Sequence, residues 1–319
     1  MSVQIDNNGL YSLPAKVVAR LMSKYYNAKN TFIADQLLPK VIVDKTVGAG
    51  KIAIAIYNAK DAEWFDGKRA LKAPISQIES GYFETKTVEL EETSGKIITD
   101  VRTFNKMLDV HGSESAVHNQ LFRDILDQIA LKLEYEAATI LQTTSNYNST
   151  QVHSKTDTYW DTSSGLPYED IQAMLDASPI PTNTLWFGKA AWSSVITNEN
   201  VRKIMSVNQD RVIQPNWFMD LFKQSGITNL VVGNGVSKNA DGTTSNLWGD
   251  KVGALYVSSD LGEESFGRNF ATTSTITMTR ELNEHNKLHS HAGTIDNVYS
   301  IVSKRAGNII TAINDPSPS

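Results

Sequence analysis

Three histidines near the C-terminal end of the chain have the residue types and spacing best suited to chemistry. His285, His289 and His291 lie in the run Glu284-His285-Asn286-Lys287-Leu288-His289-Ser290-His291. Imidazole nitrogens are common zinc ligands, and two histidines at alternate positions of a strand can share a metal ion. A catalytic zinc site also needs a third ligand and a base in fixed geometry, for which Glu284 is the near candidate. We interpret the cluster as the polar tip of a hairpin, with a metal-dependent enzyme or a metal between subunits as the alternative.

Other short motifs suggest catalysis only superficially. Gly48-Ala49-Gly50-Lys51 lacks the spacing of a phosphate-binding loop and no helical pattern follows it, which favours a turn. No serine lies in a Gly-x-Ser-x-Gly nucleophile elbow. Glu91 and Glu92 fit the solvated edge of a ribbon better than an acid/base pair. The sequence therefore predicts a protein that is not an enzyme, with no catalytic residues and no cofactor.

The composition narrows the classes further. The chain has 319 residues, 40% of them apolar, and no cysteine, so it has neither disulfides nor a thiol nucleophile. Its 30 basic and 35 acidic residues give a net charge of -5, whereas a free-standing nucleic-acid binder is usually basic. No apolar run reaches the roughly 18 residues needed to span a bilayer, and no signal pattern opens the chain. We expect a soluble protein, made in the cytoplasm, whose partners are mainly other proteins.

A long helix over 114–142 is the clearest predicted element. Ser113 is a suitable N-cap, and Glu114 complements the helix N-terminus. Apolar residues recur at spacings of three and four along one face: Phe122, Ile125, Leu126, Ile129, Leu133, Ala137 and Ile140. Gln120, Arg123, Asp127 and Glu134 are assigned to the opposite face. At 1.5 Å per residue the helix would be roughly 40 Å long, and we expect its apolar face to pack on strands within 97–101 and 270–282.

Residues 51–100 have the pattern of a long two-stranded excursion with a polar tip. Lys51–Tyr57 alternates isoleucine with alanine, and strand character returns over 82–101, while Gly67, Pro74 and Gly81 interrupt the stretch between. No apolar cluster in this stretch would anchor it to its own chain. Because an isolated two-stranded ribbon is marginal in water, such a ribbon needs another surface, and a neighbouring subunit can supply one.

The second half of the chain reads as a compact α+β unit. Thr-, Ser-, Asn- and Gly-rich residues 143–166 form a loop, after which short helices and strands alternate. Pro167 suits the first position of a helix, and Gly226 suits the end of another helix that starts at Pro215. A half-exposed strand is expected over 272–282, followed by strands over 297–313 and a frayed tail.

A series of short motifs resembles the tailed-bacteriophage major capsid, or major head, proteins. In chain order the motifs are Glu134-Tyr135-Glu136-Ala137-Ala138, Thr144-Ser145-Asn146-Tyr147, Trp160-Asp161, Pro167, Asp170-Ile171, Leu247-Trp248-Gly249, Ala254-Leu255-Tyr256 and Ser265-Phe266-Gly267. Each motif is short, and the specificity comes from their order and spacing over roughly residues 30–313.

The resemblance implies an α+β fold of the Hong Kong 97-like capsid type. It implies an N-terminal arm over 1–31 and a peripheral domain with a spine helix. An extended β-loop over 51–100 would overlap a neighbour, and an axial domain would meet its copies around five- and six-fold axes. The peripheral domain would comprise 32–50, 101–164 and 263–292. The axial domain would comprise 165–262 and 293–313, with a tail over 314–319.

The resemblance also implies partners and contacts. The chain would assemble with itself as hexamers and pentamers into an icosahedral virion head, after synthesis in the host cytoplasm. A separate scaffolding protein, a portal and non-specifically packaged double-stranded DNA would be its other partners, with no membrane. Phe122, Ile125, Leu126, Ile129 and Leu133 would form the assembly spine of the subunit. The loop residues Trp64, Lys68, Arg69 and Lys72 would make the extended-loop contacts.

Two alternatives to a phage head remain open. A nanocompartment shell protein of the encapsulin type shares the fold but encloses a cargo enzyme, and neighbouring genes would separate the two. A metal-dependent enzyme using the histidine cluster is the other, and metal analysis would test it. Some capsids of this fold also join a lysine to an asparagine of a neighbour through an isopeptide bond. Lys68 and Lys72 lie in the corresponding loop, but no motif identifies the asparagine.

Overall fold

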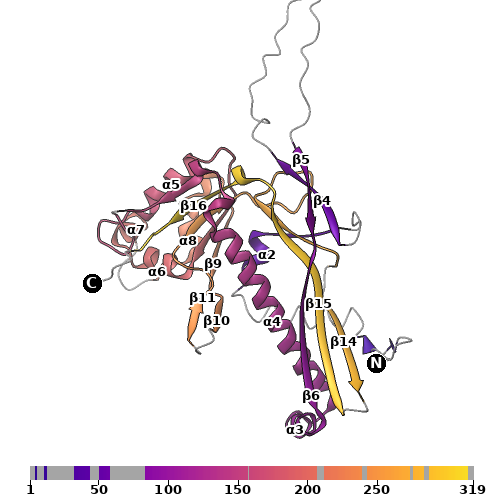
Figure 1. Ribbon diagram of the computed structural model, residues 1–319. Helices are drawn as coiled ribbons and strands as arrows, with labels where there is room; N and C mark the ends of the chain where they lie inside the picture. Colours follow the sequence, from indigo (N-terminus) through magenta and orange to yellow (C-terminus); the bar gives the residue numbers. More distant parts are fainter. Residues whose placement is uncertain are drawn as a thin grey trace, which may run out of the picture.

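The computed structural model contains a seven-stranded and a five-stranded β-sheet, two two-stranded sheets and one long helix (Figure 1). It describes residues 4–5, 11–12, 32–43, 50–57, 83–156, 158–206, 212–238, 243–273, 276–283 and 287–314. Within them, no helix is both long and apolar enough to cross a membrane.

The first sheet is organised around one long strand, β15 (Leu288–Ile301). Along one edge β15 pairs antiparallel with β6 (Glu91–Asp100) over that strand's whole length. Along the other edge it pairs with β14 (Thr277–Asn283) and then with β13 (Gly267–Ala271). β3 (Lys40–Ile42) extends the sheet beyond β13, and β2 (Tyr11–Ser12) and β1 (Gln4–Ile5) extend it beyond β14.

The predicted long helix is confirmed as α4 (Glu114–Gln142), and Ser113 caps it by accepting a hydrogen bond from the Ala116 N–H. α4 lies along the first sheet, with its apolar side chains buried among β15 and β6 (Figure 1). The expected face is correct, because all five spine residues are buried: Phe122, Ile125, Leu126, Ile129 and Leu133. The partner strands are partly corrected. β6 contains the expected 97–100, and Ile276 and Met278 of the expected 270–282 belong to the same core, but β15, which was not expected, is the main partner.

Two glycines allow this close packing of helix on sheet. A Cβ at Gly293 of β15 would lie 2.8 Å from Ile125 and 2.9 Å from the Met278 sulfur. Gly95 of β6 also faces Ile125, at an ordinary contact distance of 3.5 Å. A side chain at position 293 would therefore push the helix off the strand.

A helix that the sequence reading missed follows β6 directly. α3 (Val101–His111) begins at the residue where the expected strand character ends, and the Asp100 carboxylate caps it by accepting a hydrogen bond from the Thr103 N–H at 2.9 Å. It ends at Gly112, which adopts a left-handed φ of 74°. Phe104 packs against Val117 at the start of α4.

The second sheet has the order β7-β16-β12-β8-β9. Its strands are β7 (Val152–Ser154), β16 (Gly307–Thr311), β12 (Val252–Leu255), β8 (Thr184–Gly188) and β9 (Asn229–Gly233). The helices that accompany it are α5 (Pro167–Asp176), α6 (Lys189–Thr197), α7 (Glu199–Ile204) and α8 (Pro215–Asp220). Pro167 opens α5 as predicted, and Gly226 closes the short η4 (Lys223–Ser225) that follows α8. A small hairpin of β10 (Val236–Lys238) and β11 (Thr244–Asn246) extends from this unit (Figure 1).

A two-stranded ribbon rises from the first sheet, formed by β4 (Lys51–Tyr57) and β5 (Phe83–Glu89) (Figure 1). Its base is anchored, contrary to our expectation. Ile52 and Ile54 are 1% and 3% exposed and pack against Val41, Phe270 and Val302. The isoleucines of β4 therefore pack against Val41 of β3, Phe270 of β13 and Val302, the last two of which are more than 200 residues away along the chain.

The strand positions also bear on the segment boundaries expected from the sequence. Residues 91–100 pair with β15 in the first sheet, so the free-standing part of the excursion ends at Glu89. Residues 293–301 belong to β15 of the same sheet, and only β16 (Gly307–Thr311) from the expected final axial segment joins the second sheet.

Candidate functional site

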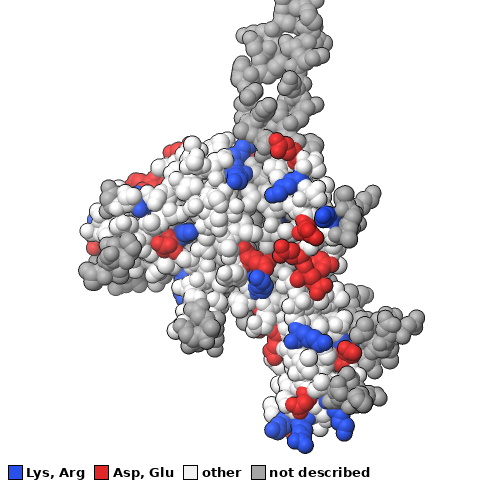
Figure 2. All heavy atoms as spheres, in the orientation of Figure 1, with Lys and Arg blue, Asp and Glu red and all other residues white. Residues whose placement is uncertain are grey.

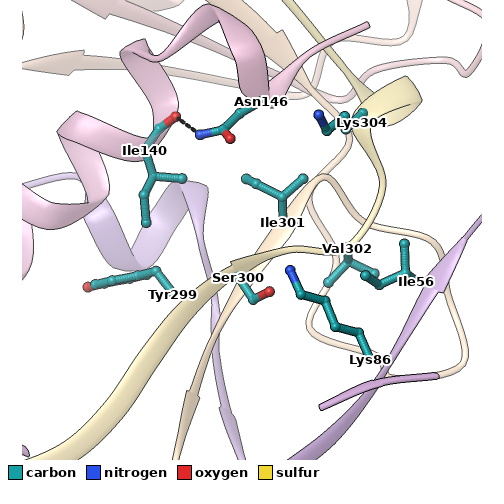
Figure 3. A pocket seen from close by; sticks show the side chains of 9 residues that line it. All are labelled: Ile56, Lys86, Ile140, Asn146, Tyr299, Ser300, Ile301, Val302 and Lys304. Atoms are coloured by element: carbon teal, nitrogen blue, oxygen red, sulfur yellow. Dashed lines mark hydrogen bonds between the residues drawn. The ribbon is translucent and has the colours of Figure 1, made fainter. Parts of the chain in front are cut away.

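A hollow opens where the C-terminal end of α4 meets the last residues of β15 and the ribbon (Figure 3). Its volume is about 390 Å³. Ile140 and Asn146 come from the end of α4 and the turn after it, and Lys86 comes from β5. The lining residues are Ile56, Lys86, Ile140, Asn146, Tyr299, Ser300, Ile301, Val302 and Lys304. The hollow therefore combines three separate segments, none of which forms it alone.

Local hydrogen bonds fix the polar rim of this hollow. The Asn146 amide donates to the Ile140 carbonyl at 2.8 Å, as Figure 3 shows. The Lys304 ammonium donates to the Ser145 carbonyl at 2.7 Å. Neither lysine of the rim, Lys86 nor Lys304, has a carboxylate among the residues that line the hollow. This end of the site is therefore suited to an acidic group.

A second hollow of about 270 Å³ continues the first along α4. The two hollows share Ile140 and Tyr299 and so lie side by side, and we call the pair the spine groove. Glu91 of β6 and Glu136 of α4 line the second part, together with the half-exposed ring of Tyr135, and Glu136 is paired with Lys132 at 3.1 Å. The spine groove thus has a basic end, an apolar middle and an acidic end, a combination suited to holding an extended peptide segment.

Two histidines of the sequence cluster lie elsewhere, inside the first sheet, and our interpretation of a polar hairpin tip is wrong for them. His291 on β15 is fully buried, and His289 is half-buried two residues before it. His285 lies outside the described residues. The burial follows from register, because β15 places His291 directly beside the start of α4, against the edge of the Phe122 ring.

A fourth histidine, His118 of α4, completes this group and was missed in the sequence. Its Nδ1 atom lies 2.8 Å from Nε2 of His291. The ring of Phe104 stacks on His289, with ring centroids 4.1 Å apart. The signal was present, since His118 precedes Leu121 and Phe122 by three and four residues on the apolar face.

The surroundings keep these histidines neutral. Burial lowers the pKa of His118 from its ordinary value of 6.5 to about 3 and that of His291 to about 4, and the nearby Arg280 guanidinium adds to both shifts. Burial also lowers the pKa of His289. Because neutral imidazole has one donor and one acceptor nitrogen, the His118–His291 contact is a hydrogen bond. In the described part of the chain, no group of three or more metal-ligating residues is placed to hold an ion.

A buried carboxylate joins three parts of the fold, and its assignment to the polar face of the helix was wrong. Glu134 is 1% exposed and accepts hydrogen bonds from the backbone N–H groups of Ile33 and Ala34 and from the Trp248 indole at 2.7 Å. Burial raises the pKa of this carboxyl, while the three donors oppose the shift. Buried Ala130 and Ala138, four residues to either side of Glu134, were the signal for its position.

The residues expected to form loop contacts cannot be placed in this geometry. Trp64, Lys68, Arg69 and Lys72 all lie outside the described residues. Lysines, arginines, aspartates and glutamates are interspersed over the face shown in Figure 2, without a large field of one sign. The described residues of this face form no continuous basic surface of the kind that a dedicated nucleic-acid binder presents.

Comparison with known proteins identifies the fold. No protein-family model matches the sequence, and no curated protein does. A phage-related protein from Bordetella bronchiseptica RB50 is similar over 99% of this chain and 100% of that one, with a TM-score of 0.71 and 17% identity. The capsid of a native GTA particle has a TM-score of 0.57 at 10% identity, covering 88% and 90% of the two chains. An encapsulin from Synechococcus elongatus PCC 7942 has a TM-score of 0.52 at 11% identity, covering 89% and 88%. The expected α+β fold of phage capsid proteins is confirmed.

Proposed function

We propose that this chain is the shell subunit of a phage head, assembling with many copies of itself into an icosahedral container for double-stranded DNA. The observation that carries the proposal is the extent of the structural similarity. The fold of the phage-related Bordetella protein matches 99% of this chain and 100% of that one. Its role is binding rather than catalysis. A separate scaffolding protein and a portal are the partners that such a shell requires.

The spine groove supplies a candidate contact between neighbouring copies. We propose that it receives residues 58–82 of an adjacent subunit, the stretch that connects β4 to β5 and contains Trp64. Within this stretch an acidic group precedes a basic group: Asp61, Glu63 and Asp66, then Lys68, Arg69 and Lys72, with Lys60 before them and Glu79 after them. The acidic group would face Lys86 and Lys304, and the basic group would face Glu91 and Glu136. Many such contacts, each modest, combine because every subunit is held at several points.

A nanocompartment shell is the second candidate, favoured by the structural likeness to the Synechococcus encapsulin. The two candidates make the same kind of shell and differ in contents. A chain encoded beside portal and terminase genes belongs to a phage, and a chain encoded beside a cargo enzyme belongs to a compartment.

Electron microscopy of the purified protein tests the proposal. We expect closed particles of uniform diameter, formed by the chain alone or after coexpression with the products of neighbouring genes. If analytical ultracentrifugation shows only monomers under both conditions, at every protein concentration measured, the shell function is contradicted.

A further inference from the structure

One long edge of the first sheet is unpaired within the described part of the chain. β6 pairs only with β15, in a register that runs without a break from Glu91 opposite Asn297 to Asp100 opposite Leu288. It contains neither proline nor a bulge, the common devices that protect an exposed edge. The outer edge of β6 therefore presents the backbone N–H and C=O groups of alternate residues to a further strand.

The side chains along this edge form a pattern with its own internal symmetry. Thr93, Gly95 and Ile97 alternate toward α4, so the intervening residues point to the opposite face, where Ile98 is 59% exposed. Within β6 those residues are Glu92, Ser94, Lys96 and Ile98. Leu90, just before the strand, continues the alternation, but it is partly buried against the cluster of Ile52 and Ile54 and its N–H donates to the Gly50 carbonyl. Read outward from Ser94 in either direction, the pattern is serine, a charged residue and an aliphatic residue, with opposite charges on the two sides.

We propose that β6 pairs antiparallel with β6 of a second copy, about a two-fold axis that passes through Ser94. This inference rests on the proposed function, and it names one contact between shell subunits. In that register Glu92 of each copy lies opposite Lys96 of the other, and Leu90 lies opposite Ile98. A two-fold contact uses the same patch on both copies. A strand can form such a contact when its side chains complement those of the same strand running in the opposite direction.

A second observation points independently to a basic group from outside the chain. Glu92 lies directly opposite Asp296 of β15, and both side chains are exposed on the same face. Like charges at directly opposite positions of a sheet are destabilising. The Thr272 hydroxyl donates to Asp296 at 3.5 Å, but no ion pair to either carboxylate occurs among the described residues. Lys96 of the second copy would lie beside Glu92 and would balance this acidic pair.

The same charges select the register. A lysine on an edge strand normally discourages pairing. Self-pairing centred on Glu92 would oppose two glutamates, and self-pairing centred on Lys96 would oppose two lysines. Of these three registers, only the one centred on Ser94 places each glutamate opposite a lysine of the other copy. The charges of the strand therefore specify one partner and one alignment.

The chain has no cysteine, so a single introduced cysteine reports only on contact with its own copy. Ser94→Cys should cross-link to a covalent dimer with an ethane-bridged bis-maleimide in assembled wild-type-like particles, since paired residues of adjacent strands lie about 5 Å apart. Thr294→Cys is the matched control. Thr294 lies opposite Ser94 on the same face but one strand inward, roughly 14 Å from its own copy across the axis.

We expect Ser94→Cys to give a cross-linked dimer band on a denaturing gel and Thr294→Cys to give none. Particles that assemble normally but give no more dimer with Ser94→Cys than with Thr294→Cys would overturn this pairing while leaving the shell function intact. Failure of the unmodified chain to form particles would instead count against the proposed function.

Charge exchange tests the register in the same Ser94→Cys background. Glu92→Lys or Lys96→Glu alone should abolish most of the cross-linked dimer, and the double exchange should restore it. Both single variants remain as folded as the parent, because these side chains are exposed. Equal cross-linking in all four proteins would refute the register centred on Ser94.

Discussion

His118 and His291, separated by 173 positions in the sequence, form a buried hydrogen bond of 2.8 Å between Nδ1 and Nε2. The pair joins the first turns of the long helix to the central strand of the first sheet. Its position beside Phe122 makes it part of the subunit core, so it cannot be replaced without consequence.

The buried histidine pair should make the fold sensitive to acid. The pKa values of about 3 for His118 and about 4 for His291 lie below the ordinary value of 6.5, so the unfolded chain binds more protons as the pH falls from about 6.5 toward 4. Stability is therefore complete above about pH 6.5 and is lost progressively below it. Thermal melting between pH 7.5 and pH 4.5 measures this loss. Arg280 and His289 are the other charged or titratable groups that act on the pair, and Glu114 acts on His289.

The double variant His118→Leu with His291→Met removes both titrating groups and keeps the site apolar. Its melting temperature should depend less on pH over this range than that of the wild type. His111→Gln, which changes an exposed histidine at the end of α3, is the control and should keep the wild-type dependence. A double variant with an unchanged pH dependence would mean that other groups dominate.

Glu134 should be required for the stability of the subunit. Glu134→Ala leaves the Trp248 indole N–H and two backbone N–H groups without an acceptor, and each unsatisfied donor costs about 1–3 kcal/mol. We expect a loss of several kcal/mol in the free energy of unfolding, measured by urea titration. Glu134→Gln retains an acceptor and should lose less. Glu136→Ala, two residues away and less buried, should change the unfolding free energy by under about 1 kcal/mol.

The two faces of α4 should respond differently to substitution. Leu126 and Ile129 are 1% and 2% exposed, so Leu126→Asp or Ile129→Asp buries an unpaired charge against β15 and β6, at a cost of several kcal/mol. These variants should be insoluble or unfolded. Arg123→Ala and Asp127→Ala lie on the other face and should fold normally. Expression in soluble form and thermal melting compare the four variants, and equal tolerance would show that the buried face is wrongly assigned.

The stretch between β4 and β5 should be needed for assembly and not for folding. Ile52 and Ile54 anchor the base of the ribbon, so replacing Asp61–Ser80 by a short Gly-Ser linker leaves that apolar cluster in place. The variant should melt near the wild-type temperature and sediment as a free subunit. Normal particles from this variant would mean that residues 61–80 make no essential contact between copies.

Local patterns in the sequence determined the long helix, its cap and its buried face. These features depend on residues that are close together in the sequence: Ser113, the three- and four-residue spacing from Phe122 to Leu133, and the proline that opens α5. Their effect can therefore be predicted before the tertiary structure is known. The order of short motifs likewise indicated the capsid fold that the solved structures confirm.

Contacts between distant segments decided the rest. Whether Glu134 faces solvent or the core depends on Trp248 and Ile33, which lie more than 100 residues away in the sequence. The burial of His291 and the pairing of β6 with β15 depend on strand register, which is fixed only when the side-chain pattern of one strand meets that of a partner distant in the sequence. The spine groove exists only where α4, β15 and the ribbon converge, and Asp100 starts a helix because its carboxylate caps α3. In each case the deciding interaction is a tertiary contact or a single cap, whose free energy exceeds the small local preferences on which sequence patterns depend.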